Sequence, residues 1–223
     1  MPTVQVTGPA VEPLTLAEAK THLRVDVSDD DTLITSLIVV ARQGAEAYTR
    51  RSMCTQTWKL VLDTFPAPGI NVGSANWYGP QWGTSPGPLT TLRPNGTTGF
   101  EIVLERGPIA SVESITYTDQ NAVTQTLAGS AYVVDLVSEP ARIVPAYGTT
   151  WPATLNQINA VTVNFTAGYG VAAAVPQSVK QWMLLQIGAM YENREAFLAG
   201  RSITITALPF IDGLLDPYRV LVY

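Results

Sequence analysis

Histidine and cysteine are nearly missing from this 223-residue chain, which holds one of each. Hydrolases that rely on a Ser–His or Cys–His pair would all have to use His22. We interpret His22 as a surface or helix-packing residue and Cys54 as a buried thiol. A single cysteine excludes intrachain disulfides, which fits a reducing compartment. An enzyme would therefore need a carboxylate-only mechanism, and the sequence shows no suitable acidic pair.

Charged residues are also scarce, at 14% of the chain against roughly 25% in typical soluble domains. The net charge of -5 argues against tight binding of nucleic acid, which needs Lys and Arg clustered on one face. The 46% hydrophobic content supports one substantial core, or a core with a smaller lobe. A weakly charged surface suits a subunit that buries surface against neighbouring molecules.

Long apolar runs and ligand-binding motifs are missing as well. No stretch approaches 18 apolar residues, and the N-terminal region lacks a basic segment followed by an apolar one, so we expect neither a membrane span nor a signal peptide. Gly168-Tyr169-Gly170 lacks the spacing and the lysine of phosphate-binding loops, and it predicts a flexible hinge. Asp26 and Asp29–Asp31 lack the alternating pattern of a calcium loop, and they predict helix capping. We expect no metal and no cofactor.

Helix signals occur near both ends of the chain. Thr15 and Glu18 form a capping box that predicts a short helix over 16–23. Ser28 and Asp29–Asp31 supply caps and negative charge for a second, long helix that ends near Arg50 and Arg51, and Pro176 opens a third helix. Spacings of three and four give one buried face to each of the last two helices: Leu33, Leu37, Ala41, Gly44 and Tyr48 flanked by Ile34, Ile38 and Ala45, and then Val179, Trp182, Met183, Ile187 and Met190.

Between these helices the hydrophobic period changes to two, which predicts strands. Strand-like segments at 55–63, 100–104, 112–118, 123–127, 131–135, 142–144 and 160–166 have connections that predict an antiparallel meander. The fold class we predict is α+β: a helical bundle from N- and C-terminal helices, an inserted antiparallel β lobe and an extended C-terminal tail. The expected parts are a helical core (1–54 and 171–200), a β lobe (55–170) with a long Pro/Gly-rich loop (66–99), and the tail (201–223).

Three aromatic residues, Trp77, Tyr78 and Trp82, lie on the loop at 66–99. A structureless segment of this length usually indicates function or disorder. The three rings suit contact with a partner protein, packing over the lobe, or stacking on sugars. Few cations are interleaved with them, so stacking on nucleic acid is disfavoured.

Three arginines, Arg50, Arg51 and Arg194, stand near predicted helix ends. Cations at such positions cap helix dipoles or pair with nearby carboxylates, and they also suit contacts between subunits. We therefore include them as candidate ring or partner contacts. The stretch after Ser202 is apolar but poorly periodic, which predicts that it has no place in the core of its own subunit.

A series of short motifs follows one another in order along residues 14–196. They are 14–24 (LTLAEAKTHLR), Asp30-Asp31 with Leu33-Ile34 and Ile38, 45–51 (AEAYTRR), 56–58, 102–104, 107–109, 114–119, 132–135, 151–152, 161–169 (VTVNFTAGY), Pro176 and 191–195 (YENRE). Each alone is a cap, a strand or a turn, whereas their order and spacing together are distinctive. In this combination the sequence resembles the head-tail connector, or adaptor, family of long-tailed bacteriophages and gene transfer agents. The loop at 66–99 is longer than the family pattern requires.

The resemblance implies a structural subunit without enzymatic activity, one of about 12 copies in a closed ring beneath a portal protein. The opposite end of the ring would receive a tail-side neck or tail-completion protein, and DNA would pass through the lumen without sequence-specific binding. The ring would be assembled in the host bacterial cytoplasm and lie in the neck of the virion. In similar proteins the C-terminal segment docks on the portal, which here corresponds to Ile203, Ile205, Leu208, Phe210, Leu214, Leu215, Tyr218 and Arg219. The alternative is a carbohydrate- or receptor-binding module of a phage particle that uses Trp77, Tyr78 and Trp82.

Overall fold

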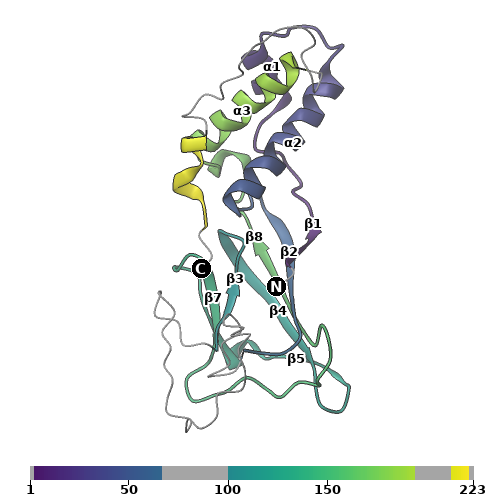
Figure 1. Cartoon of the computed structure of the whole chain (residues 1–223), viewed down its shortest axis with the longest axis vertical. Helices are drawn as coiled ribbons and strands as arrows, with labels where there is room; N and C mark the ends of the chain where they lie inside the picture. The colour runs from purple at the N-terminus through teal and green to yellow at the C-terminus, as the bar shows by residue number, and fades with distance from the viewer. Residues whose placement is uncertain (1–2, 67–99, 194–211, 221–223) are drawn as a thin grey trace, which may run out of the picture.

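The protein is described by a computed structural model that covers residues 3–66, 100–193 and 212–220. Over these ranges the α-helices are α1 (Leu16–Leu23), α2 (Asp31–Thr49) and α3 (Gln177–Glu192), and two short 3-10 turns near the C-terminus are η3 (Asp212–Leu214) and η4 (Asp216–Tyr218). The strands are β1 (Thr3–Thr7), β2 (Gln56–Leu62), β3 (Ile102–Leu104), β4 (Ile109–Thr118), β5 (Thr124–Thr126), β6 (Tyr132–Asp135), β7 (Ala141–Pro145) and β8 (Val161–Ala167). The helices gather at one end of an elongated molecule and the strands at the other (Figure 1). The predicted α+β class is confirmed.

The capping box at the start of α1 forms as its sequence predicts. The Glu18 amide donates to Thr15 Oγ1 at 3.2 Å, and the Thr15 amide donates to Glu18 Oε2 at 2.7 Å. Because Glu18 accepts hydrogen bonds from the Thr15 backbone and hydroxyl, its pKa is held below the ordinary value. The helix ends at Leu23, where Arg24 takes a left-handed conformation with φ of 58°.

The start of α2 differs from its sequence prediction in one respect. Asp30 is the N-cap residue, but its side chain makes no capping hydrogen bond. Its carboxylate instead accepts a hydrogen bond from Tyr191 Oη at 2.5 Å, which links the start of α2 to the end of α3. Asp31 pairs with Lys20 Nζ at 2.6 Å. The acidic run therefore ties the three helices together at this end of the molecule.

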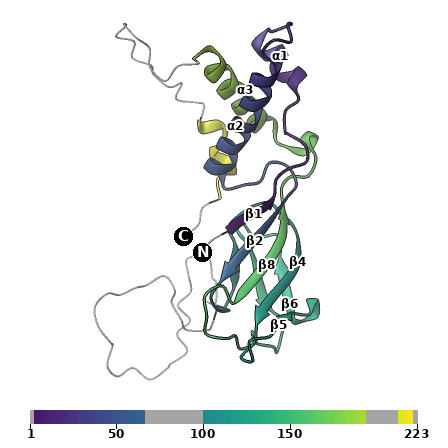
Figure 2. The same ribbon diagram turned by 90° about the vertical axis from the view of Figure 1, so that its right-hand side faces the viewer.

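The helices, whose arrangement Figure 2 shows, pack around one of the two hydrophobic cores formed by the described residues. On α2 the fully buried apolar positions are Ile34, Ile38, Ala41 and Ala45, which belong to the same core as Val179, Met183 and Ile187 of α3. The predicted face is displaced, since Leu33, Leu37 and Tyr48 are half-buried and Gly44 is exposed. The displacement has a physical cause: the C-terminal half of α2 also buries the polar residues Arg42, Glu46 and Thr49.

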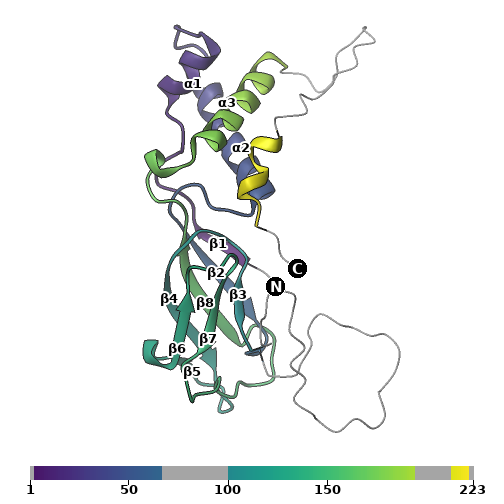
Figure 3. The same cartoon turned by 90° about the vertical axis from the view of Figure 1, so that its left-hand side faces the viewer.

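Two antiparallel sheets enclose the second core (Figures 2 and 3). One has the order β1-β2-β8-β4-β5 and the other β3-β7-β6. At the centre, β2 pairs with β8 in the register Trp58↔Phe165 and Leu60↔Val163, and both strands bury every second residue. These alternating buried residues fill the space between the sheets.

The topology corrects two sequence predictions. The strands do not form a simple meander, because β8 lies between β2 and β4 and β3 belongs to the second sheet. Hydrophobic alternation indicates which residues form a strand, but it does not identify the neighbouring strand. Residues 3–7, assigned to the helical core by sequence, instead form β1 and pair with β2.

Candidate assembly site at the helix–strand junction

Two backbone segments run in contact where the helices meet the strands. The segment from α2 to β2 contacts the segment from β8 to α3 through Tyr169 N to Met53 O at 3.3 Å and Thr55 N to Gly170 O at 3.1 Å. Gly168 has φ of +134° and faces the backbone of Cys54. Glycine is needed here because two main chains approach closely, whereas the sequence suggested a flexible hinge.

A buried group of polar side chains fills the junction beside these segments. Arg42 donates to Glu46 Oε2 at 2.9 Å and to Glu12 Oε2 at 2.7 Å, and the side chains of Arg42 and Glu46 are 6% and 8% exposed. The second Glu46 oxygen accepts from the Met53 amide at 3.0 Å and from the Gln56 side chain. Each charge is therefore paired and hydrogen-bonded, which is what burial of ions requires. Sequence analysis missed this group because Arg42 and Glu46 are buried by contacts with Glu12 and Gln56, which come from other segments of the chain.

Arg106 adds a cation to the same junction from the strand side. Its Nη1 donates to the Glu46 carbonyl oxygen at 3.0 Å, and its guanidinium carbon lies 4.4 Å from the centre of the Trp58 ring. Burial lowers the pKa of Arg106. The Trp58 indole N–H in turn donates to Ser52 Oγ at 2.9 Å. The helices and the strands are thus joined by specific polar contacts as well as by the chain itself.

Arg51 joins three separate segments. Its terminal nitrogens donate to both carboxylate oxygens of Glu139, in the turn between β6 and β7, with an Nη1–Oε1 distance of 2.7 Å. Its Nε donates to the Tyr218 carbonyl oxygen. The side chains of Arg51 and Glu139 are 9% and 48% exposed, so the guanidinium is buried while its fork-like partner is open to water on one side. The guanidinium predicted to contact a partner is therefore engaged within the chain.

Residues 212–220, which we name the C-terminal strap, pack against the helices (yellow in Figures 1 and 3). Leu215 is 0% exposed within the helical core, and Val220 is 5% exposed. Tyr48 Oη donates to Asp216 Oδ1 at 2.7 Å. The expectation that the whole C-terminal stretch lacks a place in its own core is wrong for the strap. Sequence periodicity could not reveal this, because the strap contains 3-10 turns with too few residues to show a repeat.

The other predicted partner residues divide into three groups. Arg50 and Arg219 are exposed, with Arg50 3.9 Å from Glu105 and Arg219 5.6 Å from the Tyr48 ring centre. Leu214 and Tyr218 are half-buried against the helical core. The remaining eight residues lie outside the described ranges: Trp77, Tyr78, Trp82, Arg194, Ile203, Ile205, Leu208 and Phe210.

Exposed apolar side chains occur on edge strands at two places in the strand region. Val4 and Val6 of β1 are 44% and 55% exposed, and β1 is an edge of the five-stranded sheet. Val133 of β6, at an edge of the other sheet, is exposed together with Leu136 and Val137 in the following turn. Edge strands with exposed valines are surfaces on which another chain can pack or pair.

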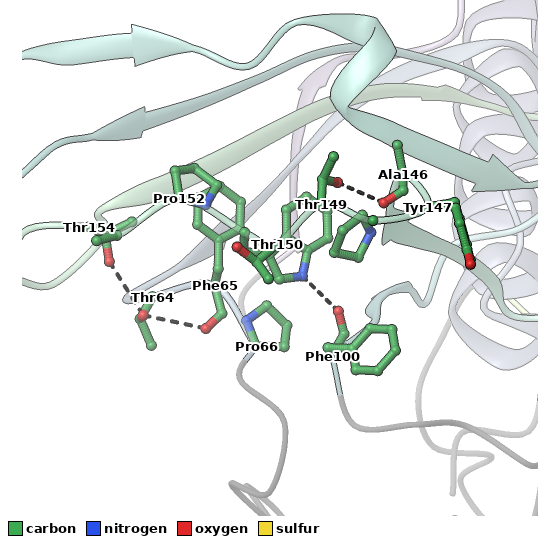
Figure 4. Close-up of a pocket in the computed structure, with 14 residues that line it drawn as sticks. Thr64, Phe65, Pro66, Phe100, Ala146, Tyr147, Thr149, Thr150, Pro152 and Thr154 are labelled. Carbon is green, nitrogen blue, oxygen red and sulfur yellow. Dashed lines mark hydrogen bonds between the residues drawn. The ribbon is translucent and has the colours of Figure 1, made fainter.

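A cavity of about 490 Å³ lies in the strand region, beside Pro66 and Phe100 (Figure 4). Its lining is aromatic, proline, threonine, alanine and glycine, with no charged residue. Phe65 stacks on Trp151 with ring centres 4.9 Å apart, and the Trp151 indole donates to the Phe100 carbonyl at 2.7 Å. The Thr149 hydroxyl donates to Ala146 O at 2.7 Å, and the Thr154 hydroxyl donates to Thr64 Oγ1 at 3.3 Å. The carbohydrate alternative depends on Trp77, Tyr78 and Trp82, which lie outside the described residues, so this cavity does not test it.

Catalytic groups are sparse in the described part of the chain. There, no cluster of three or more His, Cys, Asp and Glu side chains is suited to hold a metal ion. His22 is exposed on α1. Burial raises the pKa of the Cys54 thiol to about 11, so the thiol is protonated at neutral pH. Among the described helices none is long and apolar enough to cross a membrane.

Comparison with known proteins places these features in context. Residues 13–72 match the sequence model of the phage gp6-like head-tail connector protein family. No curated protein matches the chain significantly. Among solved structures, a chain from the neck of an empty gene transfer agent (GTA) particle computed with C6 symmetry has a TM-score of 0.71 and 20% identity, with 100% of this chain and 97% of that chain covered.

Two further GTA structures contain similar chains. A chain in the virion of the native particle gives the same TM-score of 0.71 at 20% identity. One in the neck of the native particle, computed with C12 symmetry, gives 0.63 at 22% identity, and both alignments cover 100% of this chain and 97% of the other. The chain thus matches the phage gp6-like head-tail connector family over residues 13–72 and shares its fold with chains of GTA particles, which confirms the resemblance seen in the sequence.

Proposed function

We propose that this protein is a structural adaptor subunit without enzymatic activity, which forms a ring in the neck of a tailed phage or gene transfer agent. One side of the ring binds the portal protein and the other a tail-side neck or tail-completion protein. The observation that carries the proposal is the whole-chain likeness to GTA chains, two of them from necks computed with C6 and C12 symmetry. The family match over residues 13–72 supports it independently.

The net negative charge of the chain is consistent with a ring through which DNA passes. That charge is -5, with 13 Lys and Arg against 18 Asp and Glu. The described junction arginines Arg42, Arg51 and Arg106 are all engaged within the chain. An acidic subunit repels the phosphate backbone, so DNA passes through the lumen of the ring without being held.

The two exposed edges are the ring contacts that we propose. A closed ring needs a heterologous interface, in which two different faces of one subunit meet. The β1 edge with Val4 and Val6 is one such face, and the β6 edge with Val133, together with Val137 of the following turn, is the other. Arg50 is exposed, and we assign it to the ring contact as well. Portal contact is assigned to the C-terminal region, through Ile203, Ile205, Leu208 and Phe210 and the exposed Arg219.

Electron microscopy of the purified protein mixed with the portal of the same particle tests the function directly. We expect closed rings attached to one side of the portal. A mixture in which the protein remains monomeric and unattached, at concentrations where the portal is intact, contradicts the proposal.

Two sets of variants separate the ring contact from the portal contact. Val4→Lys with Val6→Lys should prevent ring closure, because each buries a charge at the interface; Val123→Lys, at a site 51% exposed, is the matched control. Replacing Ile203, Ile205, Leu208 and Phe210 together by Ser should abolish portal attachment in a pull-down assay. Normal portal binding by this fourfold variant would overturn the docking assignment.

A further inference from the structure

The C-terminal strap has little internal structure of its own. It consists of η3 and η4, and 3-10 turns have strained hydrogen-bond geometry that persists only in short pieces. Its attachment to the helices includes the Tyr48–Asp216 hydrogen bond, a Ser178 Oγ to Tyr218 Oη bond of 3.1 Å and Val220 N to Thr49 O at 2.9 Å. The strap therefore depends on contacts with the body of the subunit.

A further contact of the strap, made by Arg51, is shared with the strand region. Arg51 donates through Nε to the strap at Tyr218 and through its terminal nitrogens to Glu139, beyond the end of β6. The backbone around Arg51 is held to the strand region as well, by Ser52 N to Gly107 O at 2.8 Å and Gly107 N to Arg50 O at 3.3 Å. The Arg51 guanidinium is thus held by hydrogen bonds to the strap and to the strand region.

We propose that the strap is a releasable latch that couples the C-terminal region to the strand region through Arg51. When Tyr218 O leaves, the Arg51 Nε–H loses its protein acceptor, and the guanidinium loses the hydrogen bond that fixes its plane from the strap side. Because the guanidinium is rigid and planar, a change in its orientation distorts the paired bonds to Glu139. Release of the strap therefore loosens the turn between β6 and β7, and loosening of that turn weakens the strap.

The coupling gives a neck subunit a way to transmit an assembly event. A partner that engages the C-terminal region and draws the strap off the helices would change the freedom of the turn carrying Leu136 and Val137, which are exposed apolar residues. This consequence for assembly rests on the proposed function. The coupling itself does not, since every contact that carries it lies within one subunit.

Hydrogen exchange on the isolated full-length protein tests the latch. Tyr48→Phe removes the hydroxyl that bonds Asp216 while keeping the ring, at the helix side of the strap and away from Glu139. We expect exchange at Val220 to rise about fivefold, in keeping with the loss of one hydrogen bond. Exchange at the turn amides of Val137 and Ser138, which donate to Asp135 Oδ1 at 3.0 and 3.1 Å, should rise with it. Unchanged exchange at Val220, or a rise confined to the strap, overturns the proposal.

The reverse experiment uses the other end of the latch. Coupling between two sites is reciprocal, so Glu139→Gln should raise exchange at Val220 and Tyr218, although neither residue is altered. Glu113→Gln is the control, because Glu113 loses a charge on the sheet while contacting Ser111 and Thr166 instead of Arg51. Strap exchange that is unaffected by Glu139→Gln, or equally affected by Glu113→Gln, overturns the coupling. Neither experiment needs a portal, so failure of the latch and failure of portal binding are distinguishable.

Discussion

A Cβ atom on Gly168 would stand 2.2 Å from the carbonyl oxygen of Cys54. Gly168 follows the last residue of β8, and Cys54 precedes β2, so this contact is where the chain leaving the sheet passes the chain entering it. The same hypothetical Cβ would lie 2.5 Å from Cys54 C and 2.9 Å from Thr55 N. All three neighbours are backbone atoms, which cannot move without shifting the central strand pair.

Gly168→Ala should therefore destabilise the protein strongly. We expect a loss of about 3 kcal/mol or more, because backbone strain at positive φ adds to a steric clash with main-chain atoms. Gly148→Ala is the matched control: Gly148 has φ of +75°, but nothing lies within 4 Å of its hypothetical Cβ, so about 1 kcal/mol is expected from strain alone. Urea denaturation followed by tryptophan fluorescence measures both. Equal losses in the two variants would show that the two main chains separate easily.

Leu215→Ala should be destabilising although Leu215 lies only a few residues from the C-terminus. The side chain is 0% exposed in the helical core, and removing a buried leucine typically costs about 2–5 kcal/mol. Val137→Ala, at a site 94% exposed, should change stability by less than about 0.5 kcal/mol. A small effect of Leu215→Ala in thermal unfolding would mean that the strap is detached in solution.

The burial of Leu215 also changes the result expected from a C-terminal deletion. Removing residues 203–223 also removes Leu215 and Val220 from the core, so the shortened subunit is expected to lose stability as well as portal contact. The sequence prediction that the stretch after Ser202 has no place in the core would instead imply a folded subunit after this deletion. Substitutions outside the strap are for this reason the cleaner test of docking.

How far the sequence determines these features depends on the range of the interactions. The bounds of α1 and the end of α2 near Arg50 follow from capping and local spacing, and the structure agrees. The position of β8 between β2 and β4 is set by contacts across about a hundred residues, which local periodicity does not encode. Local signals were sufficient for most elements, although not for β1, and insufficient for the pairing of the strands.

The junction shows the same limit at the level of side chains. Arg42 and Glu46 are four residues apart on a helix, a spacing that usually indicates an exposed ion pair. Their burial depends on Glu12 and Gln56, which reach them from other segments. Similarly, Glu139 is 88 positions from Arg51 in the sequence. Polar residues that interrupt an apolar helical stripe are the one signal that could have indicated the junction.

Glu46→Ala should destabilise the protein by about 3–5 kcal/mol, since it leaves Arg42 buried with part of its pairing lost. It also removes the acceptor of the Met53 amide. The control is Lys20→Ala, which breaks the more exposed Lys20–Asp31 pair and should cost about 1 kcal/mol or less. Chemical denaturation of both variants gives the comparison. Similar small losses would contradict the view that the buried group holds the junction together.

Cys54 should react slowly with thiol reagents while the protein is folded. Its pKa is raised from 9.0 to about 11, first by burial and then by the charges of Glu12 and Glu46. At pH 8 the thiolate, which is the reactive form, is then about 100-fold rarer than in an unfolded chain. Iodoacetamide labelling with and without urea measures the difference, and rapid labelling of the folded protein would contradict the burial of this thiol.

The same shift predicts how stability responds to alkaline pH. The folded pKa lies above the unfolded one, so the folded state holds the Cys54 proton more tightly. The resulting stabilisation is complete below pH 9 and is lost as the pH rises toward 11. Cys54→Ala removes this contribution while leaving the tyrosines and lysines that titrate in the same range. We therefore expect the stability of the wild-type protein to fall more steeply between pH 9 and 10.5 than that of Cys54→Ala, and parallel pH profiles in urea denaturation would show that the thiol is accessible to solvent at the junction.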